Sequence, residues 1–304
     1  MCSRRRRVKP RPVREIRGSV QPHLDPPLSM RSASPAIPRG GLSGNLFRAT
    51  SDNLALPTEA SFMSSYEYLT SIYSLTGEMP HRVHLEIYSL LRLVGDLTGK
   101  SVLDAACGHG LFSRVLKQSG AARVLGVDLS ESLVGLARQI EQGNPLGIKY
   151  QVEDITSPRV LGTFDLVTAA WLFPYASSPE QLAAMATSLH AELVPKGRIV
   201  GIVANPTLDL SRGNYTRYGM TVNAPATLTD GTEYTVDFFL DPPFSIGGRF
   251  WTTPTIDSAL LAAGFHDIEW SRPQCSREGM DKLGADHWAP LLENPNMLFF
   301  TARR

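Results

Sequence analysis

The sequence contains only three cysteines, and it lacks any long apolar run. Cys2, Cys107 and Cys275 are odd in number and lie far apart, so they provide neither a disulfide framework nor the close spacing of a zinc site. No apolar run reaches the roughly 18 residues that a membrane-spanning helix needs. We therefore expect a cytoplasmic protein that has no disulfides, no bound metal and no membrane span.

Charge is sparse and unevenly distributed along the chain. Charged residues make up 19% of the sequence and hydrophobic residues 42%, which is enough for an ordinary core. Residues 1–50 carry eleven Lys and Arg against Glu15 and Asp25, or +9, so the remainder carries −8 within the total of +1. An acidic main part disfavours nucleic acid as a partner.

The N-terminal stretch lacks hydrophobic periodicity. Residues 1–58 are rich in proline and contain the run Arg4 to Arg7, which predicts a disordered basic extension. They also lack the apolar segment of a secretory signal. Three interpretations are a solvated extension (or a start codon placed too far upstream), an arm that binds nucleic-acid phosphates, and an organelle transit peptide.

The dinucleotide-binding fingerprint G-x-G-x-x-G is absent, but a related pattern lies at Val102 to Gly110. Two apolar residues lead into Asp104, a turn of small residues follows, and the amphipathic run LFSRVLKQSG comes next. This order predicts a buried strand, a tight turn and a helix. Gly108 and Gly110 allow a sharp turn against which a ligand can lie. The pattern is typical of a nucleotide-type site at the carboxyl edge of a parallel sheet.

Further strands and helices alternate after this turn. VLGVD ends a second strand at Asp128, where a carboxylate can accept hydrogen bonds from a ribose diol, and YQVEDI places Asp154 after a third. FDLVTAAWLF and LVPKGRIVGIV predict a fourth and a fifth strand. Residues 131–142 and 179–193 have helical spacing. The alternation predicts an α/β protein with a doubly wound parallel sheet and helices on both faces.

Together these segments resemble class I S-adenosylmethionine-dependent methyltransferases, in particular the bacterial toxoflavin synthase-like enzymes that act on small molecules. The resemblance runs from about Ser64 to the C-terminus and includes SYEYLTSIY, SVLDAACGHG, VLGVDLS and FDLVTAAWLF. The family motif acid-x-Gly-x-Gly-x-Gly is DAACGHG here, with Ala106 in place of the first glycine. It implies a Rossmann-like, seven-stranded, mostly parallel sheet completed by strands at 266–270 and 296–303, the last one antiparallel.

The resemblance also implies S-adenosyl-L-methionine as cofactor. It places the turn after the first strand at the amino-acid end of the cofactor, Asp128 at the ribose, and Asp154 with Ile155 beside the adenine. Two alternatives stay open, because Asp128 is also suited to capping the helix that follows and Asp154 to capping a short turn. The cofactor-binding residues implied are Tyr66, Asp104, Ala106, Gly108, Gly110, Asp128, Leu129, Asp154, Ile155 and Ala170.

Residues 60–97 have helical patterning and predict an N-terminal helical lid. By resemblance this lid lies over the cofactor, where the aromatic face of Tyr66 attracts the sulfonium cation. Tyr66 is alternatively an ordinary core aromatic. His81 and His84 lie in the lid and are weak candidates for a catalytic base; the alternative is that they are surface or hydrogen-bonded structural histidines.

Residues 206–251 are rich in Thr, Tyr, Phe and turn residues, and they predict a β-rich cap inserted after the fifth strand. Turns are expected at Asp230-Gly231 and Gly247-Gly248. DPPF, at 241–244, resembles the N/D-P-P-Y/F motif of amine methyltransferases, but it lies far beyond the fourth strand and predicts a turn in the cap. The candidate acceptor-binding residues are Trp171, Tyr175, Asn205, Tyr218 and Trp251. For Tyr218 and Trp251 the alternative is packing in the core of the cap.

The sequence thus predicts a methyltransferase domain at 59–304 that methylates a small molecule, an aromatic or N-heterocyclic compound of specialised metabolism, on nitrogen rather than oxygen. Methyl transfer depends mainly on alignment of the reacting atoms, which is why a catalytic motif is not required. Two alternatives remain open. One is a methyltransferase acting on RNA, DNA or protein, and the other is a catalytically silent cofactor-binding protein.

Overall fold

The protein is described by a computed structural model that covers residues 77–156, 160–213, 215–241 and 243–304. The chain divides into two compact units, Met1–Ala55 and Leu56–Arg304, and every described residue belongs to the second. The predicted disordered extension, the first part of the helical lid and Tyr66 lie outside the described residues.

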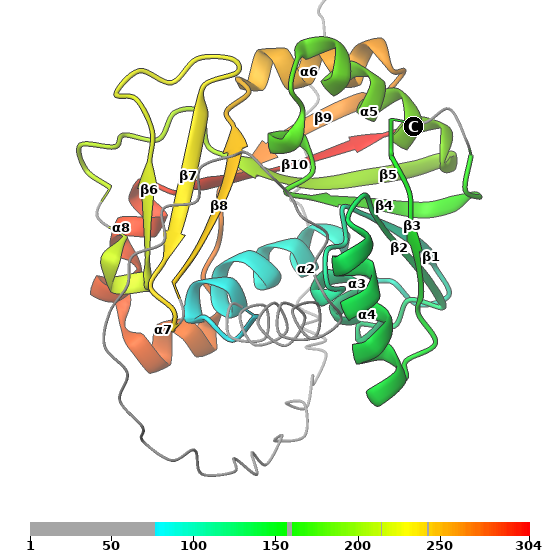
Figure 1. The fold of residues 1–304 in the computed structure, drawn as a ribbon, viewed down its shortest axis with the longest axis horizontal. Coiled ribbons are helices and arrows are strands. Elements are labelled where there is room, and N and C mark those ends of the chain that lie inside the picture. Colours follow the sequence, from blue (N-terminus) through cyan, green and yellow to red (C-terminus); the bar gives the residue numbers. More distant parts are fainter. Residues whose placement is uncertain (1–76, 157–159, 214, 242) are drawn as a thin grey trace, which may run out of the picture. The chain divides into compact units, whose positions relative to one another are not determined.

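Seven strands form one sheet in the order β3-β2-β1-β4-β5-β10-β9 (Figure 1). The pairings among β1 to β5 are parallel, whereas β10 runs antiparallel to both β5 and β9. This confirms the predicted doubly wound, seven-stranded, mostly parallel sheet. Its strands are β1 (Ser101–Ala105), β2 (Arg123–Asp128), β3 (Lys149–Val152), β4 (Phe164–Ala170), β5 (Leu193–Ala204), β9 (His266–Ser271) and β10 (Met297–Arg303).

Both faces of this sheet are buried, which explains the nearly continuous apolar sequence of its central strands. Successive side chains of a strand point to opposite faces. In β1, Leu103 packs into the cluster beneath α5 and α6, whereas Val102 packs into the cluster beneath α2, α3 and α4. In β5 the same division separates Ile199 from Val200.

The helices begin where the sequence offers capping groups. Ser130 Oγ accepts a hydrogen bond from Leu133 N at the start of α4, and Ser178 Oγ accepts one from Gln181 N at the start of α5, whose first residue is Pro179. These two helices confirm the predicted segments. The helical elements are η1 (Arg82–Ile87), α2 (Tyr88–Val94), α3 (Leu111–Gln118), α4 (Glu131–Gly143), η2 (Phe173–Tyr175), α5 (Pro179–Ala191), η3 (Thr216–Tyr218), α6 (Thr253–Ala262), α7 (Arg277–Leu283) and α8 (Ala285–Glu293).

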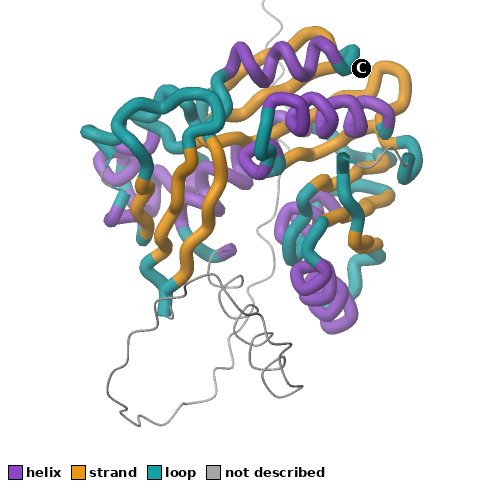
Figure 2. Tube along the Cα trace, turned by 45° about the horizontal axis from the view of Figure 1, so that its top comes forward, coloured by secondary structure: helices purple, strands orange, loops and turns teal. Residues whose placement is uncertain are grey.

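A second, three-stranded antiparallel sheet follows β5, as the predicted cap requires. It consists of β6 (Met220–Asn223), β7 (Glu233–Phe238) and β8 (Phe244–Arg249), and it stands beside the large sheet in both views (Figures 1 and 2). Its apolar side chains pack with Trp288 and Leu291 of α8. We call β6, β7 and β8 the cap sheet.

Two turn predictions within the cap have different outcomes. Asp241 lies at a bend between β7 and β8 and Phe244 begins β8, where DPPF was predicted to turn the chain; Pro242 lies outside the described residues. Gly247-Gly248 was expected to form a turn, but both residues lie within β8. A Cβ on Gly248 would come within 2.9 Å of the Tyr234 hydroxyl oxygen, so this glycine permits close packing instead of a turn.

Among the helices that the structure describes, none is both long enough and apolar enough to cross a membrane. Within the same residues, no group of three or more His, Cys, Asp or Glu is arranged to hold a metal ion.

Candidate functional site

The turn after β1 combines three left-handed backbone conformations. Ala106, Gly108 and Gly110 have φ values of 59°, 54° and 90°. A Cβ on Gly110 would collide with the Tyr150 ring, whereas a Cβ on Gly108 would meet nothing within 4 Å. Gly108 therefore leaves open space beside the backbone where a ligand can lie.

Asp128, at the end of β2, holds this turn in place. Its Oδ2 accepts a hydrogen bond of 2.8 Å from Gly108 N, and its Oδ1 accepts one of 2.9 Å from Ser130 N. Each carboxylate oxygen has a second lone pair. Asp128 thus fixes the geometry between two strand ends and still has acceptor capacity toward a ligand.

Asp104 is buried beneath the turn and does not line the cavity described below, contrary to the prediction that it contacts the cofactor. Its Oδ2 accepts a 2.6 Å hydrogen bond from Ser113 Oγ and its Oδ1 a 2.8 Å bond from Thr168 Oγ1. Burial raises the pKa of Asp104 from 3.8 to about 6. We infer that this carboxyl group ties the turn to β4 and α3.

A cavity of about 630 Å³ lies at the carboxyl edge of the large sheet, next to this turn. Parallel strands end at the same edge, so residues far apart in sequence meet there. The volume falls within the usual range for ligand sites. The lining residues that end or follow sheet strands, or begin β10, are Ala106, Cys107, Gly108, His109, Asp128, Leu129, Glu153, Asp154, Ile155, Ala170, Trp171, Asn296 and Met297.

The predicted cofactor residues at the second, third and fourth strand ends share this cavity. Leu129, Asp154, Ile155 and Ala170 all line it. Asp154 Oδ1 also accepts hydrogen bonds from Thr156 N and Thr156 Oγ1, at 2.8 and 2.7 Å. The turn-capping alternative and a place on the cavity wall are therefore compatible for this residue.

Cys107 lies in the turn and also lines the cavity. It is buried, and burial raises the pKa of its thiol well above the ordinary value. A thiol that stays protonated at neutral pH is a poor nucleophile. Cys107 therefore serves as a small residue that fills space in the turn.

The opposite wall contains a polar group that sequence reasoning missed. Glu86 of η1 is almost completely buried, and its Oε1 accepts a 2.6 Å hydrogen bond from Trp171 Nε1. Arg82 NH1 forms an ion pair of 3.1 Å with the same oxygen. Glu86, Arg82 and Trp171 all line the cavity. The spacing of Arg82 and Glu86, four residues apart on a helix, was the only sequence signal available.

Two histidines also line the cavity, His81 before η1 and His109 in the glycine turn, and His81 was a sequence candidate. Burial, and then the charge of Arg82, lowers the pKa of His81 from 6.5 to about 3 and that of His109 to about 4. Both rings are therefore neutral near pH 7. His84 does not line the cavity, because its Nδ1 is hydrogen-bonded to Ser276 Oγ at 2.9 Å.

The predicted acceptor-binding residues divide into two groups. Trp171 and Tyr175 line the cavity, but Asn205, Tyr218 and Trp251 are buried elsewhere. Asn205 Nδ2 donates a 2.7 Å hydrogen bond to Pro295 O, and the Tyr218 hydroxyl donates to His287 O. Trp251 packs in the apolar cluster beneath α5 and α6. Tyr218 and Trp251 are core residues, which is the alternative that the sequence left open for them.

The cap sheet supplies the cavity's apolar side. Its lining side chains come from all three strands, and half of them are aromatic. They are Met220, Tyr234, Val236, Phe238, Phe244 and Ile246.

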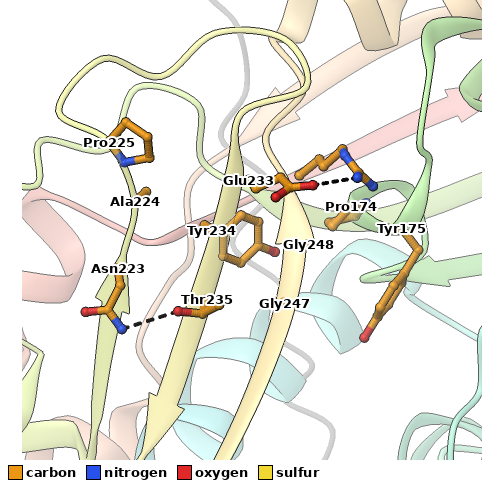
Figure 3. A pocket seen from close by; sticks show the side chains of 11 residues that line it. Pro174, Tyr175, Asn223, Ala224, Pro225, Glu233, Tyr234, Thr235, Gly247 and Gly248 are labelled. Carbon is orange, nitrogen blue, oxygen red and sulfur yellow. Dashed lines mark hydrogen bonds and ion pairs between the residues drawn. The ribbon is translucent and has the colours of Figure 1, made fainter. Parts of the chain in front are cut away.

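A second hollow of about 600 Å³ lies on the cap sheet beside η2 (Figure 3). Tyr175 faces Tyr234 and Gly248 across it, and Glu233 Oε1 pairs with Arg249 NH2 at 2.6 Å on its rim. Tyr175 and Tyr234 also line the larger cavity. These two tyrosines therefore form a wall between the two hollows.

Residues 102–197 match the sequence profile of the methyltransferase domain family. The matched segment contains the glycine turn, Asp128, Asp154 and Trp171. The chain thus contains a segment that is similar to methyltransferase domains. The narrower resemblance to toxoflavin synthase-like enzymes stays a prediction.

Two curated relatives match this domain. Ubiquinone biosynthesis O-methyltransferase from Coxiella burnetii is 36% identical over 104 residues, which are 34% of this chain and 43% of that protein. Ribosomal protein L11 methyltransferase from Burkholderia lata is 34% identical over 122 residues, 40% of this chain and 37% of that protein. The matched part of the chain thus spans less than half the length of these relatives.

Solved structures share the fold of the methyltransferase domain over a longer stretch. An S-adenosylmethionine-dependent methyltransferase from Mesorhizobium loti has a TM-score of 0.52 and 22% identity, covering 71% of this chain and 96% of its own. Another from Clostridium acetobutylicum has a TM-score of 0.55 and 15% identity, covering 79% and 98%. At these identities the likeness is one of fold.

Proposed function

We propose that this chain transfers a methyl group from S-adenosyl-L-methionine to a small-molecule acceptor, an aromatic or N-heterocyclic compound of specialised metabolism, in the cytoplasm. The observation that carries the proposal is the single cavity shared by two different walls. One wall is the glycine turn with the strand-end carboxylates, and the other consists of the cap sheet and η1. A donor and an acceptor can meet in such a cavity.

The first wall suits the cofactor. The open space at Gly108 admits a ligand against the backbone, and Asp128 beside it can accept hydrogen bonds from ribose hydroxyls. Asp154 and Ile155 lie at the next strand end, where the predicted adenine contact belongs. The cofactor, when bound, supplies an electrophilic methyl group on a sulfonium. The residues themselves need only hold it and exclude water.

The second wall suits a flat acceptor. Trp171, Tyr234, Phe238 and Phe244 offer aromatic surface, and stacked rings gain roughly 0.5–1.5 kcal/mol per contact beyond burial. A ring nitrogen with an available lone pair needs less activation than an alcohol, which favours N-methylation. The cap at 206–251 thereby belongs to the same functional domain, 59–304.

A macromolecular acceptor is the second candidate, and one observation favours it. The Burkholderia lata relative is named as a methyltransferase of ribosomal protein L11. Labelled S-adenosylmethionine, incubated with the full-length chain and separate host fractions of metabolites, RNA and protein, tests both candidates. We expect label in the metabolite fraction. Label confined to RNA or protein would transfer the proposal to the macromolecular class, and no transfer to any fraction would favour a silent cofactor-binding protein.

Asp128 provides a sharper test of the cofactor wall. Hydrogen bonds to a carboxylate contribute about 1.5–3 kcal/mol each, so Asp128→Ala should weaken cofactor binding by tenfold to several hundredfold. Titration calorimetry with S-adenosylmethionine measures the change.

Asp209→Ala is the matched control for this test. Asp209 Oδ1 accepts a backbone hydrogen bond from Ser211 N, two residues on, just as Asp128 does from Ser130, but it lies away from the cavity. Its removal should leave cofactor affinity unchanged. Equal affinities for wild type and a folded Asp128→Ala protein would remove Asp128 from the site.

A further inference from the structure

Three buried side-chain atoms of residues that line the cavity have no hydrogen-bond partner within the described part of the chain. They are His81 Nδ1, Arg82 Nε and Asn296 Oδ1. The His81 side chain is only 3% exposed. Buried polar atoms are rarely left unpaired, because each costs about 1–3 kcal/mol when its partner is missing. A bound molecule that supplies the partners would remove this cost.

The hydrogen-bonding role of His81 follows from its surroundings. The ring makes a hydrogen bond to the backbone of Tyr218 that favours the protonated nitrogen, so that nitrogen is a donor. Since Nδ1 is unpaired, the donor is Nε2. The lowered pKa keeps the ring neutral near pH 7. His81 Nδ1 therefore presents a lone pair and accepts a hydrogen bond.

The other two atoms complete a set of mixed polarity. Arg82 NH1 is engaged by Glu86, which leaves Nε–H as a free donor that carries part of the guanidinium charge. Asn296 Nδ2 contacts Met220 Sδ at 4.0 Å, and its Oδ1 is an acceptor. His81, Arg82 and Asn296 thus offer one cationic donor and two acceptors to a ligand in the cavity.

This combination restricts the chemical group that fits. A carboxylate would satisfy Arg82 but would face the lone pairs of His81 and Asn296. An aliphatic ammonium would satisfy the two acceptors and leave Arg82 unpaired. A carbonyl oxygen flanked by N–H groups satisfies all three, because the oxygen accepts from Arg82 while the N–H groups donate to His81 and Asn296.

We propose that His81, Arg82 and Asn296 are the acceptor-recognition subsite, and that it binds the edge of a planar cyclic ureide. The proposal rests on the proposed function, since it assigns the second ligand of the same cavity. Trp171 belongs to the same arrangement: Glu86 binds both Arg82 and the indole, and thereby places the aromatic surface next to the polar edge.

The test uses the full-length protein saturated with S-adenosylhomocysteine and two matched probes. Quinazolinedione is a planar bicyclic ureide, and its N,N′-dimethyl derivative has the same ring without either N–H. Calorimetry should show that the wild type binds quinazolinedione at least about tenfold more tightly than the dimethyl ring, since a site built for hydrogen bonds rejects a ligand that lacks them.

Three substitutions test the subsite residue by residue. His81→Phe keeps a ring of similar size, Arg82→Lys keeps the positive charge near Glu86, and Asn296→Leu keeps the side-chain volume. His81→Phe and Asn296→Leu remove the acceptors of the N–H groups, so each should reduce the preference to about threefold or less. Arg82→Lys alters the donor to the carbonyl oxygen, which both rings carry, so it should weaken both rings. S-adenosylhomocysteine affinity should stay at the wild-type value in all three.

His84→Asn is the matched control. His84 lies one helical turn beyond His81 but is bonded to Ser276 and not exposed to the cavity. This variant should keep the full preference. Thermal melts exclude unfolded variants, and the three independent substitutions keep the test informative if one of them fails to fold.

The outcomes separate this proposal from the proposed function. If the wild type does not bind S-adenosylhomocysteine, the proposed function itself fails. If it binds S-adenosylhomocysteine but binds neither ring, or both rings equally, the recognition subsite is wrong and the proposed function stands. A preference that survives both His81→Phe and Asn296→Leu would also overturn the subsite.

Discussion

Ala106 and Trp171, which lie at the edge of the cavity, both adopt left-handed backbone conformations, with φ values of 59° and 66°. This costs an L-residue roughly 1–2 kcal/mol. Trp171 is held from two sides, because its backbone N donates to Ile202 O at 2.8 Å and its Nε1 donates to Glu86. Strain of this kind persists where surrounding contacts determine it, commonly at binding sites.

Asp104 should lower the free energy of unfolding as the pH rises, which is the opposite of the usual effect of a carboxyl group. Burial raises its folded-state pKa from 3.8 to about 6, so the folded protein binds this proton more tightly than the unfolded chain does. Ionising Asp104 therefore lowers stability as the pH rises through this window. Asp104→Asn cannot ionise, and between about pH 4 and pH 7 it should gain about 2–3 kcal/mol in unfolding free energy relative to wild type. Urea unfolding at both pH values measures this.

Asp165 provides a control with the opposite sign. Hydrogen bonds from Ser101 lower the pKa of Asp165, so its ionised form stabilises the folded state above the ordinary pKa. Asp165→Asn should therefore lose stability relative to wild type as the pH rises toward 3.8, and it should change little between about pH 4 and pH 7. If both variants shift in the same direction, the burial of Asp104 is not the cause.

Individual site residues were predictable where they follow strands. Asp128 and Asp154 end apolar runs, so the sequence alone placed them at one edge of the sheet. Tyr218 and Trp251 were chosen because the cap is aromatic, but composition does not indicate which face of an element a side chain occupies. His81 was only a weak candidate, and its role depends on contacts with residues more than a hundred positions away.

The cap sheet contributes to the cavity through one face only. In β7, Tyr234, Val236 and Phe238 are buried and line the cavity, whereas Thr235 is exposed on the other face. Val236→Trp adds a large ring into the acceptor end. We expect it to abolish methyl transfer and leave the affinity for S-adenosylmethionine within about twofold, because overpacking acts locally.

Thr235→Trp carries the same added ring on the same strand. Its side chain lies on the other face of β7 and lines the second hollow. Turnover and cofactor affinity should both stay near wild type. If Thr235→Trp inactivates and Val236→Trp does not, the acceptor binds in the second hollow instead.

At the level of elements, regular periodicity was a reliable guide. The five parallel strands and helices α4 and α5 follow from apolar runs, capping residues and spacing. The π-helical turn η1 was not predictable, because its hydrogen bonds differ from those of an α-helix while its sequence spacing does not. The turn predicted at Gly247-Gly248 was wrong for a similar reason, because glycine occurs both in turns and where chains pack closely.

The whole chain combines a basic extension with an acidic remainder. Residues 1–58 have no apolar periodicity. A chain that begins at Glu59 should therefore retain full turnover with any small-molecule acceptor that the full-length protein uses. Comparison of initial rates at equal cofactor saturation measures this. A large loss of activity with an unchanged circular dichroism spectrum would assign the extension a part in catalysis.

The two walls of the cavity come from different stretches of sequence. The turn and strand ends lie within 102–197, whereas the cap sheet, η1 and the start of β10 lie outside it. Under the proposed function, substitutions can accumulate in the second set while the first stays intact. Descendants of one ancestral gene can thereby exchange acceptors without losing the cofactor. A phylogeny built from the residues of the turn and strand ends alone would therefore group enzymes that no longer share a substrate.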